Sequence, residues 1–402
     1  MKKVYVAIMG LGTVGKGTYD DILDSHDKIA AVYGLDLVVK RVLDKNEARF
    51  GCLPDGVGTT SVDDIISDSE ISIVVETMGG VEPAKTFITR AFNSGKSVVS
   101  ANKELIAKHW EELQDCAERN GVGFYFEASC VGAVPIIRVL NESVRNDTIE
   151  AVYGIINGTT NYILSKMTHE GVGYQEALKQ AQELGYAEFN PEADVEGYDA
   201  GYKLAILSTM AYDKRVRFSK EDCHGITGVT RESIEYAKGA SYAIKLIAES
   251  RMVNGELCYR VHPMAVKNTH MLAAVEGAMN GVWLHCKNAG GMMLYGYGAG
   301  SRQTGSAILS DVVYCAEKSR HIYYNLKENA RVGKNMDYAR FIVVPRVDEE
   351  IALSVLSGEL YEAVTLPGAK VIVTKKMNDE RWLAKLNELK EVKILCQFEA
   401  LV

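Results

Sequence analysis

The sequence predicts an α/β protein that begins with a parallel sheet covered by helices, continues with an α+β region and then adds a smaller βα unit. Short apolar runs such as residues 4–8 and 71–76 alternate with helical patterns, which is typical of buried parallel strands. The composition shifts near residue 134, where we place the first boundary. We expect domains over residues 1–134, 135–304 and 332–402, with a helix at 305–320 completing the first.

Composition limits the function before any motif is considered. A net charge of −8 over 402 residues argues against nucleic acid or an anionic membrane as partner, and no apolar run is long enough to span a bilayer. The eight cysteines are scattered singly, without the spacing of a zinc site or a disulfide framework. Met1–Lys3 leads directly into a strand, so we expect no signal peptide. These observations favour a cytoplasmic protein that acts on small molecules.

A glycine pattern follows the first predicted strand directly. Gly10, Gly12 and Gly15 form a G-x-G-x-x-G sequence between a strand and a helix, which is the context that dinucleotide binding requires. The first glycine permits a tight turn, the second lets the pyrophosphate approach the backbone, and the third lets helix and strand pack closely. Thr13 and Val14 begin the helix, whose free N–H groups face the phosphates. We therefore predict a Rossmann nucleotide-binding domain.

Residues at three further strand ends bear on the cofactor. Asp44 lies where an acid would bind the adenosine ribose of NAD, whereas Lys45 lies where a cation would bind the 2′-phosphate of NADP. These signals conflict, so the choice between NAD and NADP stays open. Thr77 and Lys103 each follow another predicted strand, and ligands in open α/β sheets bind at such ends. Both are expected in the cofactor site, although Lys103 could also be a solvated lysine at a helix start.

The stretch of residues 185–204 gathers several acids and one lysine. Asp199 and Lys203 stand one helical turn apart on the same face of a predicted helix. From this spacing alone, a surface salt bridge is the more common outcome. The alternative is a buried lysine held by carboxylates, with Glu188 and Asp194 nearby to receive an amino group.

A series of motifs follows in a fixed order over roughly residues 1–320. The series comprises Gly10–Gly15, Glu76–Gly80, Ser100–Lys103, Glu127–Pro135, Asn157–Tyr162, Gly185–Lys203, Tyr297–Gly300 and Thr304–Ala307. It resembles the homoserine dehydrogenase family, and a joint match is far more specific than any single motif. The resemblance implies reversible reduction of L-aspartate 4-semialdehyde to L-homoserine by NADPH or NADH in threonine, methionine and isoleucine biosynthesis.

The resemblance also implies roles for individual residues. Lys103 and Lys203 would flank the reacting oxygen, with Lys203 as the acid–base residue. Glu188 would bind the substrate amino group, aided by Asp194 and Asp199. The polar cluster after Asn157 could line a pocket or cap a helix, and the resemblance places Gly158 and Thr159 with the substrate. Gly298 would lie near the cofactor.

Residues 128–135 form a loop of small side chains, whose exposed backbone carbonyls could hold a hard cation. The resemblance places a sodium-like ion at Glu127, Cys130, Gly132 and Val134. Cys130 stands where the family usually has valine, a change that need not matter if the contact is a backbone carbonyl.

In the C-terminal unit, the sequence pattern predicts strands at 339–344, 370–374 and 392–398 and helices at 349–356 and 378–389. This pattern resembles a degenerate ACT domain, which in relatives binds an amino acid such as threonine. The family's Asp-x-Pro-Gly effector turn is absent, and Val344-Pro345-Arg346-Val347-Asp348 stands in its place. We therefore expect a structural or dimerising role rather than threonine feedback.

Oligomerisation is a further expectation. The resemblance implies a homodimer or homotetramer, and Trp283, Met292, Met293 and Leu294 are expected in the core of a sheet that could form the interface.

Two rival functions remain. Another aldehyde dehydrogenase-like Rossmann oxidoreductase would share the nucleotide-binding half but would not need the residues from Glu188 to Lys203. A non-catalytic nucleotide or amino-acid sensor would have no need of an acid–base pair, so the presence of both Lys103 and Lys203 argues against it.

Overall fold

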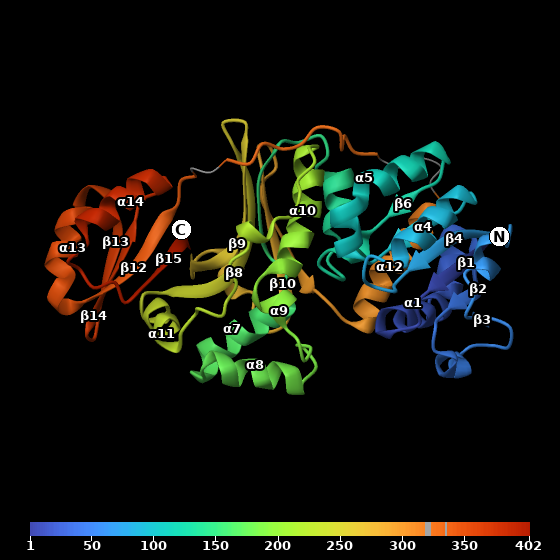
Figure 1. Cartoon of the computed structure of the whole chain (residues 1–402), viewed down its shortest axis with the longest axis horizontal. Helices are drawn as coiled ribbons and strands as arrows, with labels where there is room; N and C mark the ends of the chain where they lie inside the picture. Colours follow the sequence, from blue (N-terminus) through green and yellow to red (C-terminus); the bar gives the residue numbers. More distant parts are fainter. Residues whose placement is uncertain (318–322, 334–335) are drawn as a thin grey trace. The chain divides into compact units, whose positions relative to one another are not determined.

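The computed structural model describes residues 1–317, 323–333 and 336–402. The chain divides into two compact units, each built from separate segments of the sequence (Figure 1). The first unit contains residues 1–148, 205–218 and 296–329, and the second contains residues 149–204, 219–295 and 330–402.

A six-stranded parallel sheet forms the centre of the first unit, in the order β3-β2-β1-β4-β5-β6. The strands are β1 (Lys2–Met9), β2 (Leu35–Leu43), β3 (Gly58–Thr59), β4 (Ile71–Glu76), β5 (Ser97–Ser100) and β6 (Phe124–Tyr125). The order reverses direction between β1 and β4, and a crevice for a nucleotide forms at such a point. This sheet agrees with the predicted Rossmann domain.

Helices cover this sheet, and α1 packs on α12 while α4 packs on α5 (Figure 1). The helices are α1 (Thr13–Asp24), α2 (His26–Tyr33), α3 (Asp63–Ile66), α4 (Ala84–Asn93), α5 (Lys103–Arg119), α6 (Ile136–Arg138) and α12 (Ser301–Glu317). A Cβ atom on Gly17 would lie 2.3 Å from the Ser301 carbonyl oxygen, and one on Gly305 would lie 2.9 Å from the Thr18 nitrogen. These two glycines allow α1 and α12 to touch, so residues far apart in the sequence share one core.

The sequence predicts one helix over residues 14–29, and this prediction is wrong in its length. The backbone leaves helical geometry at Ser25, with φ −96° and ψ 1°, and a second helix then runs to Tyr33. Gly34 ends α2 in the left-handed conformation, with φ 67°, which glycine adopts without steric cost.

A nine-stranded mixed sheet forms the second unit, in the order β11-β10-β7-β8-β9-β15-β12-β14-β13. Its strands are β7 (Ile149–Ile155), β8 (Tyr242–Val253), β9 (Glu256–Lys267), β10 (Met279–Cys286), β11 (Gly290–Tyr297), β12 (Ala339–Pro345), β13 (Leu360–Leu366), β14 (Ala369–Thr374) and β15 (Cys396–Leu401). The helices of this unit before its C-terminal part are α7 (Gly158–Glu170), α8 (Tyr174–Glu183), α9 (Glu192–Val195), the first half of α10 (Tyr198–Tyr212) and α11 (Arg231–Gly239). Helices α7 and α11 pack on β8, whereas α8 and α9 pack on α7.

The C-terminal part of this sheet has βαββαβ connectivity, with α13 (Glu349–Leu356) and α14 (Asp379–Glu388) on the same side of its strands (Figure 1). Ile342, Leu356 and Trp382 belong to the core between these helices and strands. Strand β15 pairs in parallel with β9, with Glu399 opposite Met264. The C-terminal residues therefore extend the sheet that contains β7–β9.

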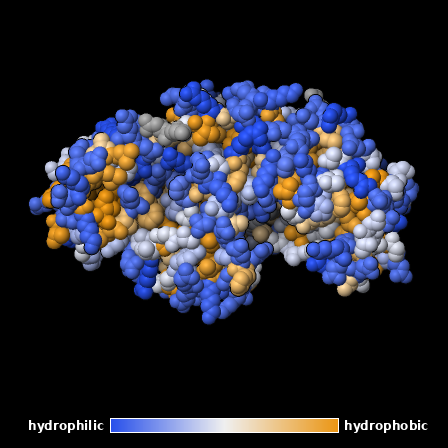
Figure 2. All heavy atoms as spheres, in the orientation of Figure 1, coloured by the Kyte–Doolittle hydropathy of each residue, from blue (hydrophilic) through white to orange (hydrophobic). Residues whose placement is uncertain are grey.

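The surface carries both polar and apolar side chains. Apolar atoms gather over the C-terminal unit, at the left of Figure 2, and Val347 and Ile351 are among its exposed apolar residues. Met292, Met293 and Leu294 were expected in the sheet core, but they are only half-buried, since β11 is an edge strand of the sheet. All eight cysteines are free thiols. Among the described helices, none is long and apolar enough to cross a membrane.

Candidate active site

The glycine loop between β1 and α1 has the geometry that its sequence predicts. Gly10 has φ +102°, and a Cβ atom there would lie 2.9 Å from the Thr77 carbonyl oxygen. A Cβ atom on Gly15 would lie 1.8 Å from the Gly10 carbonyl oxygen, so only glycine allows this helix start to pack on the strand. A Cβ atom on Gly12 would meet nothing within 4 Å. The space in front of Gly12 is thus open to a ligand, as required for pyrophosphate binding.

A cavity of about 460 Å³ opens beside this loop. Gly10, Gly12 and Thr77 line it together with Asp44 and Lys45. The structure therefore brings together five of the ten residues predicted to bind the cofactor. Thr13 and Val14 lie next to them in the first turn of α1.

The Asp44 carboxylate is buried and fully engaged. It accepts hydrogen bonds from the Leu11 N–H at 2.8 Å and the Asn46 N–H at 2.9 Å, and it forms an ion pair with Arg49 at 2.9 Å. Burial acts to raise the pKa of Asp44, but these hydrogen bonds and the guanidinium hold it below its usual value. Asp44 thus fixes the glycine loop, and Arg49 joins Lys45 in the cavity wall.

A second buried carboxylate, Glu76, joins two neighbouring strand ends. Glu76 is fully buried and accepts hydrogen bonds from the Met78 N–H at 2.8 Å and the Ser100 hydroxyl at 2.6 Å, and burial raises its pKa. The Ser100 hydroxyl accepts from the Asn102 N–H at 3.1 Å, and Asn102 caps α5 through the Leu105 N–H. Lys103 is therefore the first residue of a helix whose start is held rigidly at the sheet edge.

The segment that contains Gly298 lies close to the glycine loop within the first unit. The Ser301 hydroxyl donates to the Thr13 carbonyl oxygen at 2.7 Å. A Cβ atom on Gly132 would lie 2.5 Å from the Gly298 carbonyl oxygen, and the Ala133 N–H donates to the Tyr297 carbonyl oxygen at 3.0 Å. The loop proposed to bind a cation thus packs on the segment next to the cofactor loop.

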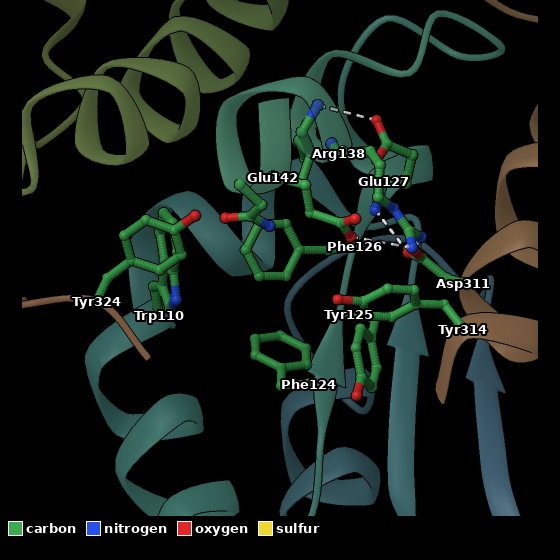
Figure 3. Close-up of a pocket in the computed structure, with 12 residues that line it drawn as sticks. Trp110, Phe124, Tyr125, Phe126, Glu127, Arg138, Glu142, Asp311, Tyr314 and Tyr324 are labelled. Atoms are coloured by element: carbon green, nitrogen blue, oxygen red, sulfur yellow. Dashed lines mark hydrogen bonds and ion pairs between the residues drawn. The ribbon is translucent and has the colours of Figure 1, made fainter. Parts of the chain in front are cut away.

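The run of residues 124–127 predicts a strand that includes Glu127, but β6 ends at Tyr125 and Glu127 begins a short turn. Its carboxylate accepts from the Ile137 N–H at 2.9 Å and the Arg138 N–H at 2.7 Å, so it caps the start of α6. Asp311 accepts from the Glu127 N–H at 2.8 Å and pairs with the Arg138 guanidinium at 2.7 Å, and Figure 3 shows these side chains together. Burial and the Asp311 charge raise the pKa of Glu127.

The neighbouring loop has an unusual backbone. Val131 has φ 58° and Gly132 has φ 55°, so two successive residues occupy the left-handed region. This conformation is unfavourable for a β-branched residue such as Val131. Cys130, Val131 and Val134 are buried, and the loop is therefore held by its surroundings.

In the second unit, Lys203 and Asp199 form a buried pair on α10. The Lys203 Nζ donates to Asp199 Oδ2 at 2.7 Å and to the Ile156 carbonyl oxygen at 2.8 Å. The two side chains are only 11% and 7% exposed. The prediction of a surface salt bridge, which the spacing alone favours, is wrong, because both side chains are buried and contact Ile156 and Asn157, the two residues between β7 and α7. The lysine is instead a buried ammonium group.

Asn157 connects this pair to Asp194. The Asn157 amide nitrogen donates to Asp194 Oδ1 at 2.7 Å and to Asp199 Oδ2 at 2.9 Å, while its oxygen accepts from the Thr160 N–H at 2.9 Å and so caps α7. Burial and the nearby Asp199 carboxylate raise the pKa of Asp194. One amide thus holds two carboxylates next to one ammonium group.

The other residues predicted to bind the substrate differ in their burial and contacts. Thr159 is buried, and its hydroxyl donates to the Tyr186 carbonyl oxygen at 2.6 Å. A Cβ atom on Gly158 would lie 2.9 Å from the Ala278 carbonyl oxygen. Glu188 is exposed in the segment between α8 and α9, and the structure does not place it in the hydrogen-bonded group around Asp194.

Three residues of the site were not predicted from the sequence. Arg49 follows Asp44 by five positions, and no motif marks it. Glu76 and Asn157 lie inside recognised motifs, but only the structure reveals their hydrogen bonds. An acid at a strand end and an Asn-Gly pair before a helix were the available signals.

Family models match most of the chain. The model described as "Homoserine dehydrogenase, NAD binding domain" matches residues 10–127, and the model described as "Homoserine dehydrogenase" matches residues 135–313.

Individual relatives agree with the family models. A homoserine dehydrogenase of Bacillus subtilis is 40% identical over 322 residues, covering 80% of this chain and 74% of the relative. One of Synechocystis is 41% identical over 314 residues, covering 77% of this chain and 72% of the relative.

Solved structures extend the likeness to the whole chain. A homoserine dehydrogenase from Thiobacillus denitrificans superimposes with a TM-score of 0.87 at 33% identity and covers 100% of this chain and 99% of the other. A hyperthermophilic archaeal homoserine dehydrogenase in complex with NADPH gives a TM-score of 0.66 at 27% identity, covering 78% and 98%. From its nucleotide loop, its buried lysine and these matches, the chain belongs to the homoserine dehydrogenase family.

Proposed function

We propose that Lys203 is the acid–base residue in the reduction of L-aspartate 4-semialdehyde to L-homoserine, and that Lys103 is the second cation at the reacting oxygen. The observation that carries this proposal is the buried Lys203 ammonium group, held by Asp199 and the Ile156 carbonyl. A bound nicotinamide cofactor would supply the hydride, and the aldehyde oxygen would then gain negative charge. A preorganised ammonium group stabilises that charge and supplies the proton.

Lys203→Met tests this role. Turnover should be lost while NADPH affinity is nearly unchanged, because the nucleotide loop belongs to the first unit. Lys166→Met is the matched control, since Lys166 forms an exposed pair with Glu170 on α7. Loss of cofactor affinity with turnover preserved would contradict the role of Lys203.

The substrate amino group is assigned to the acidic side of the same site. Asp194 and Asp199 lie next to Asn157, and their combined charge favours a cationic partner. Glu188 is proposed to close on this group from its exposed segment, with Gly158 and Thr159 forming the adjoining backbone.

NADPH is the proposed cofactor. Lys45 and Arg49 line the cavity beside the glycine loop and suit a 2′-phosphate, and the Asp44 carboxylate is already occupied by two N–H groups and Arg49. A relative in the family is known in complex with NADPH. Comparison of kcat/KM for homoserine oxidation with NADP and NAD tests the assignment. Lys45→Ala should reduce the preference for NADP, whereas the remote Lys28→Ala should not.

A sodium-like ion is proposed at the carbonyl oxygens of Glu127, Cys130, Gly132 and Val134. The successive left-handed residues of this loop support an arrangement of carbonyl groups, and the Glu127 carboxylate is already used by two N–H groups. Thermal unfolding in NaCl and in choline chloride tests the proposal, with higher stability expected in NaCl.

The C-terminal βαββαβ unit is proposed to be ACT-like in fold and structural in role. The pairing of β15 with β9 and the absence of the effector turn at residues 344–348 both support the structural role. Ala400 is buried in β15, so Ala400→Asp should destabilise the second unit, whereas the exposed Lys393→Asp should not.

A homodimer or homotetramer is proposed, with the edge strand β11 in the interface. Its half-buried methionines and the exposed Tyr295 and Tyr297 support a covered apolar surface. Sedimentation of Leu294→Glu should give a smaller species than the unchanged chain.

A further inference from the structure

Glu76 is the last residue of β4 and lies at the edge of the first unit's sheet where the cofactor loops begin. Strand β4 lies between β1, which leads to the glycine loop, and β5, which leads to Lys103. The Glu76 side chain is fully buried. Acidic side chains are almost never fully buried unless their polar atoms are paired, so the partners of Glu76 indicate what it does.

One carboxyl oxygen of Glu76 fixes the turn that follows β4. Oε1 accepts a hydrogen bond from the Met78 N–H at 2.8 Å. Gly79 and Gly80 then have φ of 73° and 70°, a conformation that glycine adopts without steric cost. Met78 and Gly79 line the cofactor cavity. The Glu76 carboxyl group therefore determines the shape of one wall of that cavity.

The other carboxyl oxygen reaches the start of α5. Oε2 of Glu76 accepts from the Ser100 hydroxyl at 2.6 Å, and the Ser100 hydroxyl accepts from the Asn102 N–H at 3.1 Å. Asn102 is followed directly by Lys103, the first residue of α5. Two hydrogen bonds therefore separate the Glu76 carboxyl group from the backbone that carries Lys103.

The Asn102 side chain closes these contacts into a ring. Its amide nitrogen donates to the Gly80 carbonyl oxygen at 2.6 Å, and its oxygen accepts from the Leu105 N–H at 3.1 Å. The turn after β4 and the start of α5 are thus joined twice, through Ser100 and through Gly80. We call this set of hydrogen bonds the Glu76 ring, and its residues are Glu76, Met78, Gly80, Ser100 and Asn102.

The same strand end is also joined to the glycine loop. The Thr77 N–H donates to the Met9 carbonyl oxygen at 2.9 Å. The Thr77 hydroxyl donates to the Gly10 carbonyl oxygen at 2.8 Å. Hydrogen bonds therefore run along three neighbouring strand ends, from the glycine loop through Glu76 to Lys103.

We propose that Glu76 is a positioning residue, which holds Lys103 in a fixed place relative to the wall of the cofactor cavity. A cation at the first position of a helix lies at the positive end of the helix dipole, so other contacts must hold it there. A displacement of about 1 Å in a reacting group can slow a reaction about a hundredfold. This inference rests on the role proposed above for Lys103.

The protonation state of Glu76 suggests a conservative substitution. Burial raises the pKa of Glu76, although hydrogen bonds from Ser100 and Met78 act in the opposite direction. The neutral acid is therefore favoured, and it offers one acceptor and one donor. Glutamine has the same shape, and its amide can accept from the Met78 N–H and donate to the Ser100 oxygen. Glu76→Gln should keep the Glu76 ring, whereas Glu76→Leu should break it.

The test measures hydride transfer from homoserine to NADP in the full chain, by stopped-flow absorbance of NADPH under single-turnover conditions. The rate constant should fall about tenfold or more in Glu76→Leu and stay within about twofold in Glu76→Gln. A purely structural role would reduce the amplitude, which reports the amount of folded protein, and leave the rate constant unchanged. Glu118→Leu is the control, because Glu118 is exposed near the other end of α5, and its rate constant should not change.

Ser100→Ala guards against misfolding of Glu76→Leu. It removes one hydroxyl group and leaves the hydrogen bond from Met78 to Glu76 in place. Its rate constant should fall severalfold, with the amplitude of the unchanged chain. Unchanged rate constants in both Ser100→Ala and Glu76→Leu, or equal losses in Glu76→Gln and Glu76→Leu, would overturn the inference.

A double-mutant cycle separates this inference from the role of Lys103 itself. If Glu76 acts through Lys103, Glu76→Leu should change the rate constant less than about threefold in the Lys103→Met background. An unchanged rate constant in Lys103→Met alone would overturn the proposed role of Lys103 and the inference with it. A slower Lys103→Met in which Glu76→Leu keeps its full effect would overturn only the positioning by Glu76.

Discussion

Removal of one carboxylate should reveal how much of the second unit's stability depends on the Lys203 ammonium group. In Asp199→Asn, the lysine keeps the Ile156 carbonyl and a neutral amide oxygen but loses the carboxylate to which it donates, and Asp194 is the nearby carboxylate that remains. Breaking a buried pair from one side costs about 3–5 kcal/mol because a charge stays buried without compensation. Since the amide oxygen still accepts a hydrogen bond, we expect about 3 kcal/mol.

Calorimetry measures this loss. For a unit of this size, about 3 kcal/mol lowers the melting temperature by roughly 6–12 °C. Glu170→Gln is the matched control, because Lys166 and Glu170 form the same i,i+4 pair on α7 but are 30% and 44% exposed. An exposed pair of this kind contributes about 0.5 kcal/mol or less, so its melting temperature should hardly change.

The double variant Asp199→Asn/Lys203→Met separates stability from chemistry. With both charges removed, much of the stability should return, while turnover stays absent. If Asp199→Asn melts no lower than Glu170→Gln, the pair is solvated and the argument for a buried catalytic lysine fails.

Further predictions follow from other sites. Gly12→Ala should leave the melting temperature unchanged but weaken NADPH binding, measured by fluorescence. Gly15→Ala should unfold the nucleotide domain, because a Cβ atom there clashes with the backbone. Equal effects of the two substitutions would contradict this prediction. Glu188→Ala should raise KM for homoserine more than it lowers kcat, and an unchanged KM would remove Glu188 from the amino-group site. The stabilisation from His262, whose pKa is raised to about 9, is complete below pH 6.5 and is lost as the pH rises through 9, at roughly 3 kcal/mol. The Glu399 pKa is lowered to about 2, so its stabilisation is present above about pH 4.5 and is lost as the pH falls to 2. Urea unfolding across pH should show both limbs. His262→Gln should flatten the alkaline limb and reduce the acid one, because His262 is the main group that lowers the Glu399 pKa.

Local patterns in the sequence predicted the local features of the fold well. The glycine spacing requires a strand, a turn and a helix; Gly10 and Gly15 have the predicted roles in the turn and in packing, while the role of Gly12 in pyrophosphate binding stays a prediction. The four-residue spacing of Asp199 and Lys203 predicted their contact, since spacing fixes which side chains meet on a helix.

Contacts between residues far apart in the sequence could not be predicted from these local patterns. The buried pair of Asp199 and Lys203 contacts Ile156 and Asn157, which lie far from it in the sequence. The use of Asp44 by the Leu11 N–H depends on how two strand ends meet, and the parallel pairing of β15 with β9 joins distant segments. A one-dimensional pattern contains no record of such partners.

The pairing of β9 with β15 has a consequence for synthesis of the chain on the ribosome. Until residues 396–401 emerge, the outer edge of β9 has no neighbour, although β8 is already available on its other side. An unpaired strand edge is a template for aggregation. Nascent chains stalled before this point should therefore recruit chaperones, and those released afterwards should not.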